Sequence, residues 1–497
     1  MNKQPAVAAL RDPHALRTPR AASLVWLDAT LAATFLLSAC AGTPTTDAAS
    51  TSTAPARWEA PLPHQGQTTD LTRWWQQFDD PALAELITAA ENVSPTLASA
   101  RSRIAQARAT RTAAGAALGP NATATAGLVR GRQDFVTPVG TTASAGLQAA
   151  WELDVFGGGR AGRTAAQARL EGAQAGWHEA RVSVAAETAV NYLALRACEA
   201  QAEQSQADAA SRAETARLTQ LTAKSGFQAP ATEALARASA AQASAQLTAQ
   251  RAQCDIDMKA LVALTGIDEV ALRSQLASRK AVLPQPSEIV VTTVPGEALN
   301  QRPDLYAAAR DLVAASADVS QARAQRLPRV SLNGSLTVGR FESGGASTNG
   351  NLWSIGPLSV SLPIFDGGTR AANVDAARAR YDEASSAYRG KLRNAVREVE
   401  EALVQLQSTA SRSEDARIAA EGFRASYLAT EARFRGGLTS LFELEDSRRT
   451  AVQAESQLIE LRRERVAAWI TLYRALGGGW TTADLQTADA ASDTTSK

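Results

Sequence analysis

The stretch LQAAWELDVFGGGR, residues 147–160, joins two different hydrophobic periods. Apolar residues alternate with polar or small ones from Leu147 to Val155, which is the two-residue period of a β-strand with one apolar face. Residues 160–225 then contain no proline and are rich in Ala, Arg, Glu and Gln, which favours one helix on the order of 100 Å long. The sequence therefore predicts a strand followed by a helix several times longer than those of ordinary globular proteins.

The same order of features occurs twice along the chain. The matching landmarks are Pro95 and Pro303 (303 − 95 = 208), Phe156 and Phe365 (365 − 156 = 209), and Gly226 and Gly437 (437 − 226 = 211). Such a small drift in spacing predicts an internal tandem duplication, with structural repeats at 81–264 and 303–476.

Each repeat contains two candidate strands. Besides 147–155, apolar residues alternate in 122–128, 330–338 and 358–364, and polar loops are expected around 130–144 and 341–351. Such strands often form the half-buried edge of a soluble sheet, but an apolar outer face with a polar inner face is typical of a membrane barrel. Four strands cannot close a barrel, because an open edge in lipid leaves backbone groups unpaired. We therefore expect an α+β membrane protein in which three copies complete a trimeric 12-stranded β-barrel, four strands per protomer.

The helical segments predict a coiled-coil barrel that continues the strands. Residues 369–435 form a second proline-free run, and the antiparallel partners of the two long helices are expected at 231–264 and 441–476. Segments 81–118 and 303–325 are expected to cover the other halves. Apolar and small residues recur at three- and four-residue spacing, as coiled-coil seams require. A solitary structural coiled-coil rod is the alternative, and it leaves the strands unexplained.

The N-terminus has the features of a secretion signal. Arg11, Arg17 and Arg20 precede an apolar stretch, residues 24–39, that is too short to span a bilayer. It ends in Leu37-Ser38-Ala39-Cys40, which resembles a bacterial lipobox. We expect a signal peptide over 1–39 and a lipid-modified Cys40, with palmitate among its acyl chains; an ordinary secretory signal is the alternative. Ala41 implies the outer membrane, because an inner-membrane retention signal usually has Asp there.

Composition argues against several other classes of function. The 497 residues include 51 basic and 50 acidic ones, a net charge of +1 that disfavours a nucleic-acid partner. The three histidines and three cysteines are widely separated, and the phosphate-binding and nucleophile motifs are absent, so we expect no metal, no cofactor and no enzymatic activity.

Two cysteines are placed symmetrically about the first expected hairpin turn. Cys198 lies 28 residues before Gly226 (226 − 198 = 28) and Cys254 lies 28 after it (254 − 226 = 28). They would sit at equal height in an antiparallel pair, and the periplasm is oxidising, so we expect a Cys198–Cys254 disulfide. Two unrelated buried thiols are the alternative.

Six motifs in order resemble the TolC family of outer-membrane efflux proteins, in particular its lipid-anchored subgroup. They are Trp75-x-x-Phe78-x-x-Pro81, residues 151–157, Arg302-Pro303-Asp304-Leu305, residues 362–368 and Ala475-Leu476-Gly477-Gly478-Gly479-Trp480, with the Leu37–Cys40 signal before them. The resemblance implies a homotrimer in the cell outer membrane, in contact with its lipid and extending into the periplasm. It implies a passive duct for drugs or other small molecules, served by an inner-membrane pump and a periplasmic adaptor, as in multidrug resistance. Equatorial segments would be 40–80, 265–302 and 477–497.

The resemblance also suggests where such a duct docks and closes. The turns Lys224-Ser225-Gly226-Phe227 and Arg435-Gly436-Gly437-Leu438-Thr439-Ser440 resemble adaptor-docking tips. The family often has an acid two positions after the second-tip glycine, where this chain has Thr439. Candidates for an acidic aperture are therefore Glu443, Glu445 and Asp446, and a solvated helix face explains these acids equally well.

Overall fold

A computed structural model describes residues 55, 58–60, 71–132, 139–286 and 299–484. The first repeat contains α2 (Pro81–Val93), α3 (Pro95–Ala116), β1 (Asn121–Gly131), β2 (Gly140–Leu153), α4 (Gly158–Lys224) and α5 (Pro230–Thr265). The second contains α8 (Pro303–Ala324), β3 (Arg329–Ser343), β4 (Ala346–Ser361), α9 (Thr369–Arg435) and α10 (Leu441–Ala475). Short elements outside the repeats are η2 (Leu71–Phe78), α6 (Glu269–Leu276), η3 (Ala277–Arg279) and η4 (Gly477–Gly479).

Two helices of the first repeat match two helices of the second in length. α3 and α8 both have 22 residues and begin 208 positions apart (303 − 95 = 208). α4 and α9 both have 67 residues and begin 211 positions apart (369 − 158 = 211). Because the offset is constant within each pair, it assigns to each position of α3 and α4 a structural counterpart in α8 and α9.

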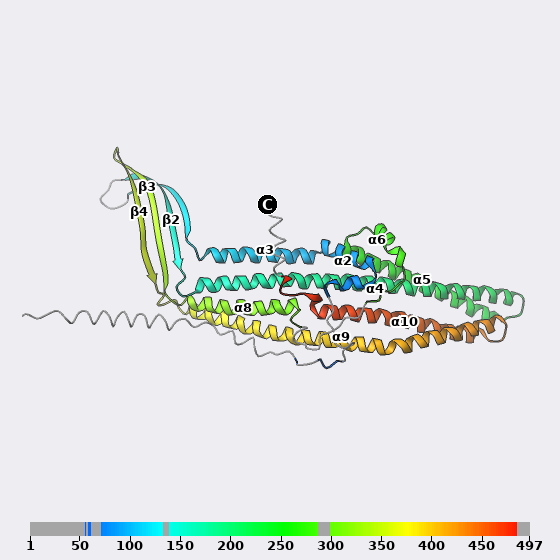
Figure 1. The fold of residues 1–497 in the computed structure, drawn as a ribbon. Helices are drawn as coiled ribbons and strands as arrows, with labels where there is room; N and C mark the ends of the chain where they lie inside the picture. The colour runs from blue at the N-terminus through cyan, green and yellow to red at the C-terminus, as the bar shows by residue number, and fades with distance from the viewer. Residues whose placement is uncertain (1–54, 56–57, 61–70, 133–138, 287–298, 485–497) are drawn as a thin grey trace, which may run out of the picture. The chain divides into compact units, whose positions relative to one another are not determined.

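The long helices α4 and α9 are each accompanied by two shorter ones. In Figure 1, α3 and α8 lie beside the halves of α4 and α9 nearer the strands, and α5 and α10 lie beside the other halves. Each long helix begins after a glycine with positive φ, Gly157 at 76° and Gly368 at 90°. Glycine adopts this conformation without a side-chain penalty, so it can turn the chain sharply from strand to helix.

The segment 81–118, expected to cover half of α4, consists of two helices. α2 ends at Val93 and α3 begins at Pro95, whose ring has no N–H and disfavours helical geometry in the preceding residue. Ser94 caps the second helix, since its hydroxyl accepts a hydrogen bond from the Leu97 N–H at 3.3 Å.

The four strands form one antiparallel sheet in the order β1-β2-β3-β4. Leu147 pairs with Leu336 and Leu336 with Trp353, whereas the next register row joins Gln148, Ser335 and Ser354. Directly paired residues share a face, so one face is apolar and the other polar. The sheet thus has the two-faced pattern that the sequence predicted.

The prediction of polar loops around 130–144 and 341–351 is wrong in extent, because the loops are shorter than expected. The strands continue through residues 140–144 and 346–351, and β3 reaches β4 through Gly344 and Gly345, both with positive φ. Backbone pairing holds these Ser-, Thr- and Gly-rich stretches in the sheet although they lack apolar alternation. Conversely, the alternation around Val155 and Ile364 lies beyond the ends of β2 and β4.

The largest hydrophobic core of the described residues joins η2 and α2 to the middle of α4 and α9 and to the C-terminal part of α10. Trp74 is fully buried there and stacks on Tyr473, with ring centroids 4.9 Å apart. The expected equatorial segment 265–302 contributes α6 and η3, whereas 1–39 and most of 40–80, including Cys40, lie outside the described residues. None of the described helices contains a stretch long and apolar enough to cross a membrane.

Candidate functional site

The two hairpin turns end α4 and α9 in the same way. Phe227 N–H donates to the Thr222 carbonyl at 2.9 Å, and Gly226 N–H donates to the Ala223 carbonyl at 3.0 Å. The second turn repeats this pattern with Leu438 and Gly437. These are Schellman motifs, in which glycine supplies the positive φ, 76° at Gly226 and 71° at Gly437. The glycines predicted from sequence therefore have a conformational role.

Each tip presents a large apolar side chain to solvent. Phe227 is 82% exposed, Leu438 is 73% exposed and Phe442, one turn further along, is 74% exposed. In a Schellman motif such a residue often packs back on its own helix, and here it does not. Ser440 caps α10 by accepting the Glu443 N–H at 3.2 Å. The tips thus form two rigid turns with exposed apolar contacts, suited to binding another protein.

Behind the tips, the two hairpins are joined by a polar network centred on Glu445 of α10. Its carboxylate accepts hydrogen bonds from Arg212 Nη1 of α4 at 2.8 Å and from Ser239 Oγ of α5 at 2.7 Å. It also accepts one from Arg448 Nη1 at 2.6 Å. One carboxylate therefore links α10 to both helices of the other hairpin.

Arg448 extends this network into the core. Its side chain is 1% exposed, and Nη2 donates to Ser211 Oγ at 3.2 Å and Thr215 Oγ1 at 3.0 Å, both on α4. The guanidinium also lies over the ring of Tyr427 from α9, 5.5 Å from its centroid. A buried arginine costs a large desolvation energy unless it is paired in this way. We call Arg212, Ser239, Glu445, Arg448 and their hydrogen-bond partners the inter-hairpin network.

The four aperture candidates differ in their burial and in their hydrogen-bond partners. Glu445 is half-buried within the inter-hairpin network, whereas Glu443 is exposed and Asp446 is exposed and paired with Arg449. The Thr439 hydroxyl is buried and lacks a hydrogen-bond partner among the described residues. Sequence reasoning missed Arg212 and Arg448, because the partners that join them to the other hairpin lie more than 230 positions away.

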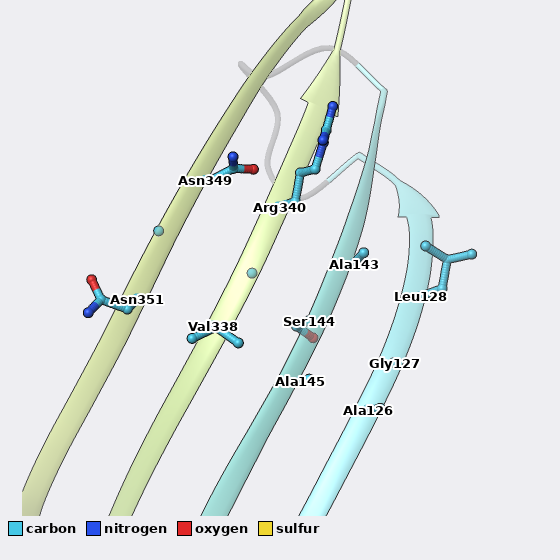
Figure 2. A pocket seen from close by; sticks show the side chains of 12 residues that line it. Ala126, Gly127, Leu128, Ala143, Ser144, Ala145, Val338, Arg340, Asn349 and Asn351 are labelled. Atoms are coloured by element: carbon cyan, nitrogen blue, oxygen red, sulfur yellow. The ribbon is translucent and has the colours of Figure 1, made fainter.

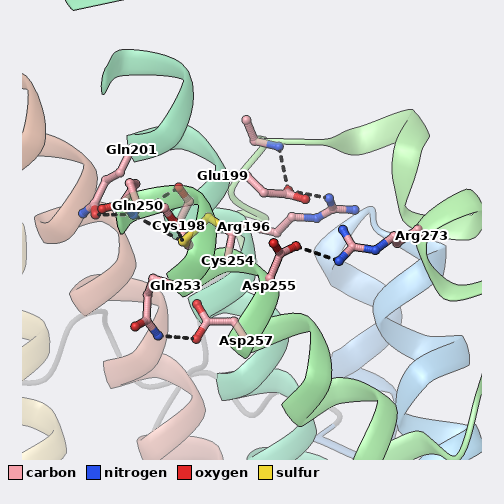
Figure 3. Close-up of a disulfide and its surroundings, with 11 residues drawn as sticks. Arg196, Cys198, Glu199, Gln201, Gln250, Gln253, Cys254, Asp255, Asp257 and Arg273 are labelled. Carbon is pink, nitrogen blue, oxygen red and sulfur yellow. Dashed lines mark hydrogen bonds and ion pairs between the residues drawn. A yellow bond between two sulfur atoms is a disulfide. The ribbon is translucent and has the colours of Figure 1, made fainter. Parts of the chain in front are cut away.

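Cys198 and Cys254 lie at equal height in the α4–α5 pair, as Figure 3 shows. Their Cα atoms are 5.5 Å apart and the structure joins their sulfur atoms in a disulfide. Two residues earlier, the fully buried Arg196 pairs with Glu199 at 2.8 Å and donates to the Leu276 carbonyl at 2.9 Å. Glu199 in turn accepts the Ala281 N–H at 3.0 Å. This cluster fastens the chain after α6 onto α4.

The sheet carries a shallow, open hollow lined by all four strands (Figure 2). Most lining residues are small, and Arg340, Asn349 and Asn351 are its larger polar side chains. Among the described residues no group of three or more His, Cys, Asp or Glu side chains could hold a metal ion. Nothing in this hollow brings an acid, a base and a nucleophile together.

Two-faced strands followed by paired helical hairpins with apolar tips define a protomer of an envelope channel. The sequence profile described as "Outer membrane efflux protein" matches residues 86–267 and 294–478, one match in each repeat. The chain belongs to this outer membrane efflux protein family, the family that the TolC resemblance indicated.

Individual relatives agree over most of the chain. The pyoverdine export outer membrane protein OpmQ of Pseudomonas putida is 30% identical over 443 residues, covering 86% of this chain and 92% of the relative. The toluene efflux pump outer membrane protein TtgF, also of Pseudomonas putida, is 28% identical over 435 residues, covering 86% and 89%.

A solved structure of the outer-membrane channel OprN has a TM-score of 0.77 and 30% identity, covering 86% of this chain and 98% of that one. The Campylobacter jejuni CmeC channel matches in fold, with a TM-score of 0.76 at 23% identity over 87% of this chain and 93% of that one. The expected α+β fold class, with four strands and long helical hairpins in each protomer, is confirmed, and so is the function of an outer-membrane efflux protein.

Proposed function

We propose that this chain forms the trimeric exit duct of a tripartite efflux system. Three copies contribute twelve strands to one barrel in the outer membrane, and their helices continue it into the periplasm. The duct is passive: an inner-membrane pump supplies the energy, and a periplasmic adaptor connects the pump to the hairpin tips. Cys40 carries a lipid anchor at the membrane surface.

The open sheet is the observation that carries this proposal. β1 and β4 are its edges, and each pairs with one neighbour only in the described protomer. An exposed apolar face that includes Leu147, Leu336 and Trp353 belongs in lipid, where an unpaired strand edge would leave backbone groups without partners. Pairing β1 of one copy with β4 of the next satisfies both edges, and with three copies the barrel closes.

The inter-hairpin network supports a gate behind the tips. Glu445 and Arg448 hold the α9–α10 hairpin against α4 and α5, and moving the hairpins apart would break these hydrogen bonds. An adaptor that binds the exposed tip residues would favour the separated packing, which is a shift between two states of the hairpins.

The cargo is a small organic molecule. OpmQ is named for pyoverdine export and TtgF for toluene efflux, and the hollow on the sheet of this chain is open rather than a closed pocket shaped for one compound.

Drug and solvent susceptibility of a deletion strain tests this function. Complementation with the wild-type gene should restore resistance, whereas Phe227→Ser with Leu438→Ser should not, because the tips lose their apolar contacts with the adaptor. Leu428→Ser is the matched control and should restore resistance, because Leu428 is an exposed residue of α9 that lies outside the tip turn. Unchanged susceptibility on deletion, with no adaptor recovered on purification, would contradict the proposal.

A further inference from the structure

Helices α3 and α9 each have an exposed face at the two ends of one row of helices. α3 packs against α4, α4 against α8 and α8 against α9 (Figure 1). The exposed residues of α3 include Ser99, Arg103, Gln106, Ala109 and Ala113. The exposed residues of α9 include Asn373, Ala376, Ala379, Arg380 and Glu383.

The chain already contains a seam of this type inside the protomer, between α4 and α8. Its centre is a buried cluster of small residues, Ala165 and Ala168 of α4 with Ala314 and Ala317 of α8. Ion pairs flank the cluster: Arg169 with Asp318, and Arg310 with Glu171 at 3.3 Å. A Cβ added to Gly172 would lie 3.8 Å from the Asp311 carboxylate, so these two positions oppose each other.

The duplication carries this seam onto the two exposed faces. The offset of 211 takes Gly162, Ala165, Ala168, Arg169 and Gly172 of α4 to the five exposed residues of α9. The offset of 208 takes Ala307, Asp311, Ala314, Ala317 and Gln321 of α8 to the five exposed residues of α3. All ten counterparts are exposed in the protomer, although four of the originals form a buried cluster. The same helix positions are therefore present twice, once in a buried seam and once exposed, and four of the ten have the same residue type, Ala109, Ala376, Ala379 and Arg380.

The exposed faces of α3 and α9 also have residues of opposite charge at opposing positions. Arg103 of α3 is the counterpart of Asp311, and Glu383 of α9 is the counterpart of Gly172. Asp311 and Gly172 oppose each other in the internal seam, so the exposed faces have an arginine and a glutamate at the two opposing positions. α3 has four arginines and no acidic residue. Neither Arg103 nor Glu383 has an ion-pair partner within the described part of the protomer, so both are available to another chain.

We infer that α3 of one copy packs on α9 of the next in the geometry of the α4–α8 seam. In this seam the Arg103 guanidinium pairs with the partner subunit's Glu383, and Ala109 packs against the partner subunit's Ala376. The inference rests on the trimer proposed above and assigns the residues that hold its helical part together.

Charge exchange tests the ion pair. Arg103→Glu and Glu383→Arg should each lower the temperature at which the detergent-solubilised trimer dissociates, since each places like charges in contact. The double variant should restore that temperature. Arg101→Glu makes the same charge change on the same helix outside the seam and should have little effect. Equal effects of Arg101→Glu and Arg103→Glu, without rescue in the double variant, would overturn the pair.

Cross-linking tests the register independently. Ala109→Cys combined with Ala376→Cys should give a covalent trimer on a non-reducing gel after mild oxidation, and neither single variant should. A wild-type protein that is monomeric in detergent would refute the proposed duct. A wild-type trimer whose double-cysteine variant does not cross-link would refute only this seam.

Discussion

At the scale of single residues, Arg448 is the side chain on which the inter-hairpin network depends most. It is almost fully buried and donates to two hydroxyl groups of α4 as well as to Glu445. All three acceptors would lose a hydrogen bond if the guanidinium were removed.

Arg448→Met should therefore loosen the closed packing of the tips. Glu445 keeps its hydrogen bonds from Arg212 and Ser239, so the cost is that of buried acceptors left without a donor, about 1–3 kcal/mol. We expect higher single-channel conductance in planar bilayers and greater uptake of a large antibiotic. Arg449→Met removes an exposed arginine one position away and should leave both unchanged; a closed, wild-type conductance in Arg448→Met would show that the network does not restrain the tips.

His178 is expected to make the stability of the fold depend on pH. Burial lowers its pKa below the ordinary value of 6.5, with Arg181 acting in the same direction and Asp484 opposing. Trp177 contacts its ring, with centroids 4.8 Å apart, and Nε2 has no partner among the described residues. The unfolded chain then binds the proton more readily than the folded one, so stability decreases as pH falls through about 6.5.

Between pH 7.5 and 5.5 we expect the melting temperature of His178→Phe to fall less than that of the wild type. Each unit by which the pKa is lowered contributes about 1.4 kcal/mol to this difference. Thermal melting at a series of pH values measures it, with both proteins compared at each pH so that other groups cancel. Parallel curves for the two proteins would exclude His178 as the group responsible.

Residue-scale prediction from sequence succeeded where the backbone alone demands a residue type. Gly226 and Gly437 were predicted at the tips because reversal between helices needs positive φ, and both have it. Glu445 was singled out only among three acids, because spacing along α10 cannot reveal a partner on α4. Its role in joining the hairpins required the packing of four helices.

At the scale of elements, neighbouring residues of a strand lie on opposite faces of the sheet, one apolar and one polar, and this difference can be tested. Leu336 lies on the apolar face between Leu147 and Trp353, and Ser335 lies on the polar face between Gln148 and Ser354. A lysine on a lipid-facing position near the middle of a barrel strand costs about 2–4 kcal/mol.

Leu336→Lys should thus reduce the amount of assembled protein in the outer membrane, whereas Ser335→Lys should be tolerated. Membrane fractionation and heat-resistant oligomer on a gel measure the effect. The reverse order of the two variants would mean that the polar face meets the lipid.

The Cys198–Cys254 disulfide is expected to stabilise the α4–α5 hairpin. The bond closes a loop with a sequence separation of 56, for which chain entropy gives roughly 4 kcal/mol. Cys198→Ser with Cys254→Ser should lower the melting temperature, and reductant should lower that of the wild type to the same level. Thiol titration of the unreduced mature protein should find neither thiol reactive; two reactive thiols would rule out the bond.

Elements were predicted best where their ends are marked by composition. α9 begins and ends at the predicted residues, because glycines and a proline-free run bound it on both sides. The polar halves of the strands were missed, since Thr141, Asn349 and their neighbours are held by pairing with other strands rather than by a hydrophobic pattern of their own.

At the scale of the whole molecule, two independent attachments to the membrane are expected, and Cys40 allows them to be separated. The apolar face of the sheet is expected to supply one attachment, and a lipid on Cys40, which lies outside the described residues, is expected to supply the other.

Cys40→Ser should abolish incorporation of labelled palmitate while leaving the protein in the outer-membrane fraction as a trimer, because strand pairing between copies does not involve the lipid. A signal-peptide replacement that secretes the same mature chain without a lipobox is the control for export. Combined with Leu336→Lys, Cys40→Ser should release much more protein into the soluble fraction than either change alone. Release of the single Cys40→Ser variant as a soluble monomer would mean that the sheet does not anchor the protein, and the closed twelve-stranded barrel would then be wrong.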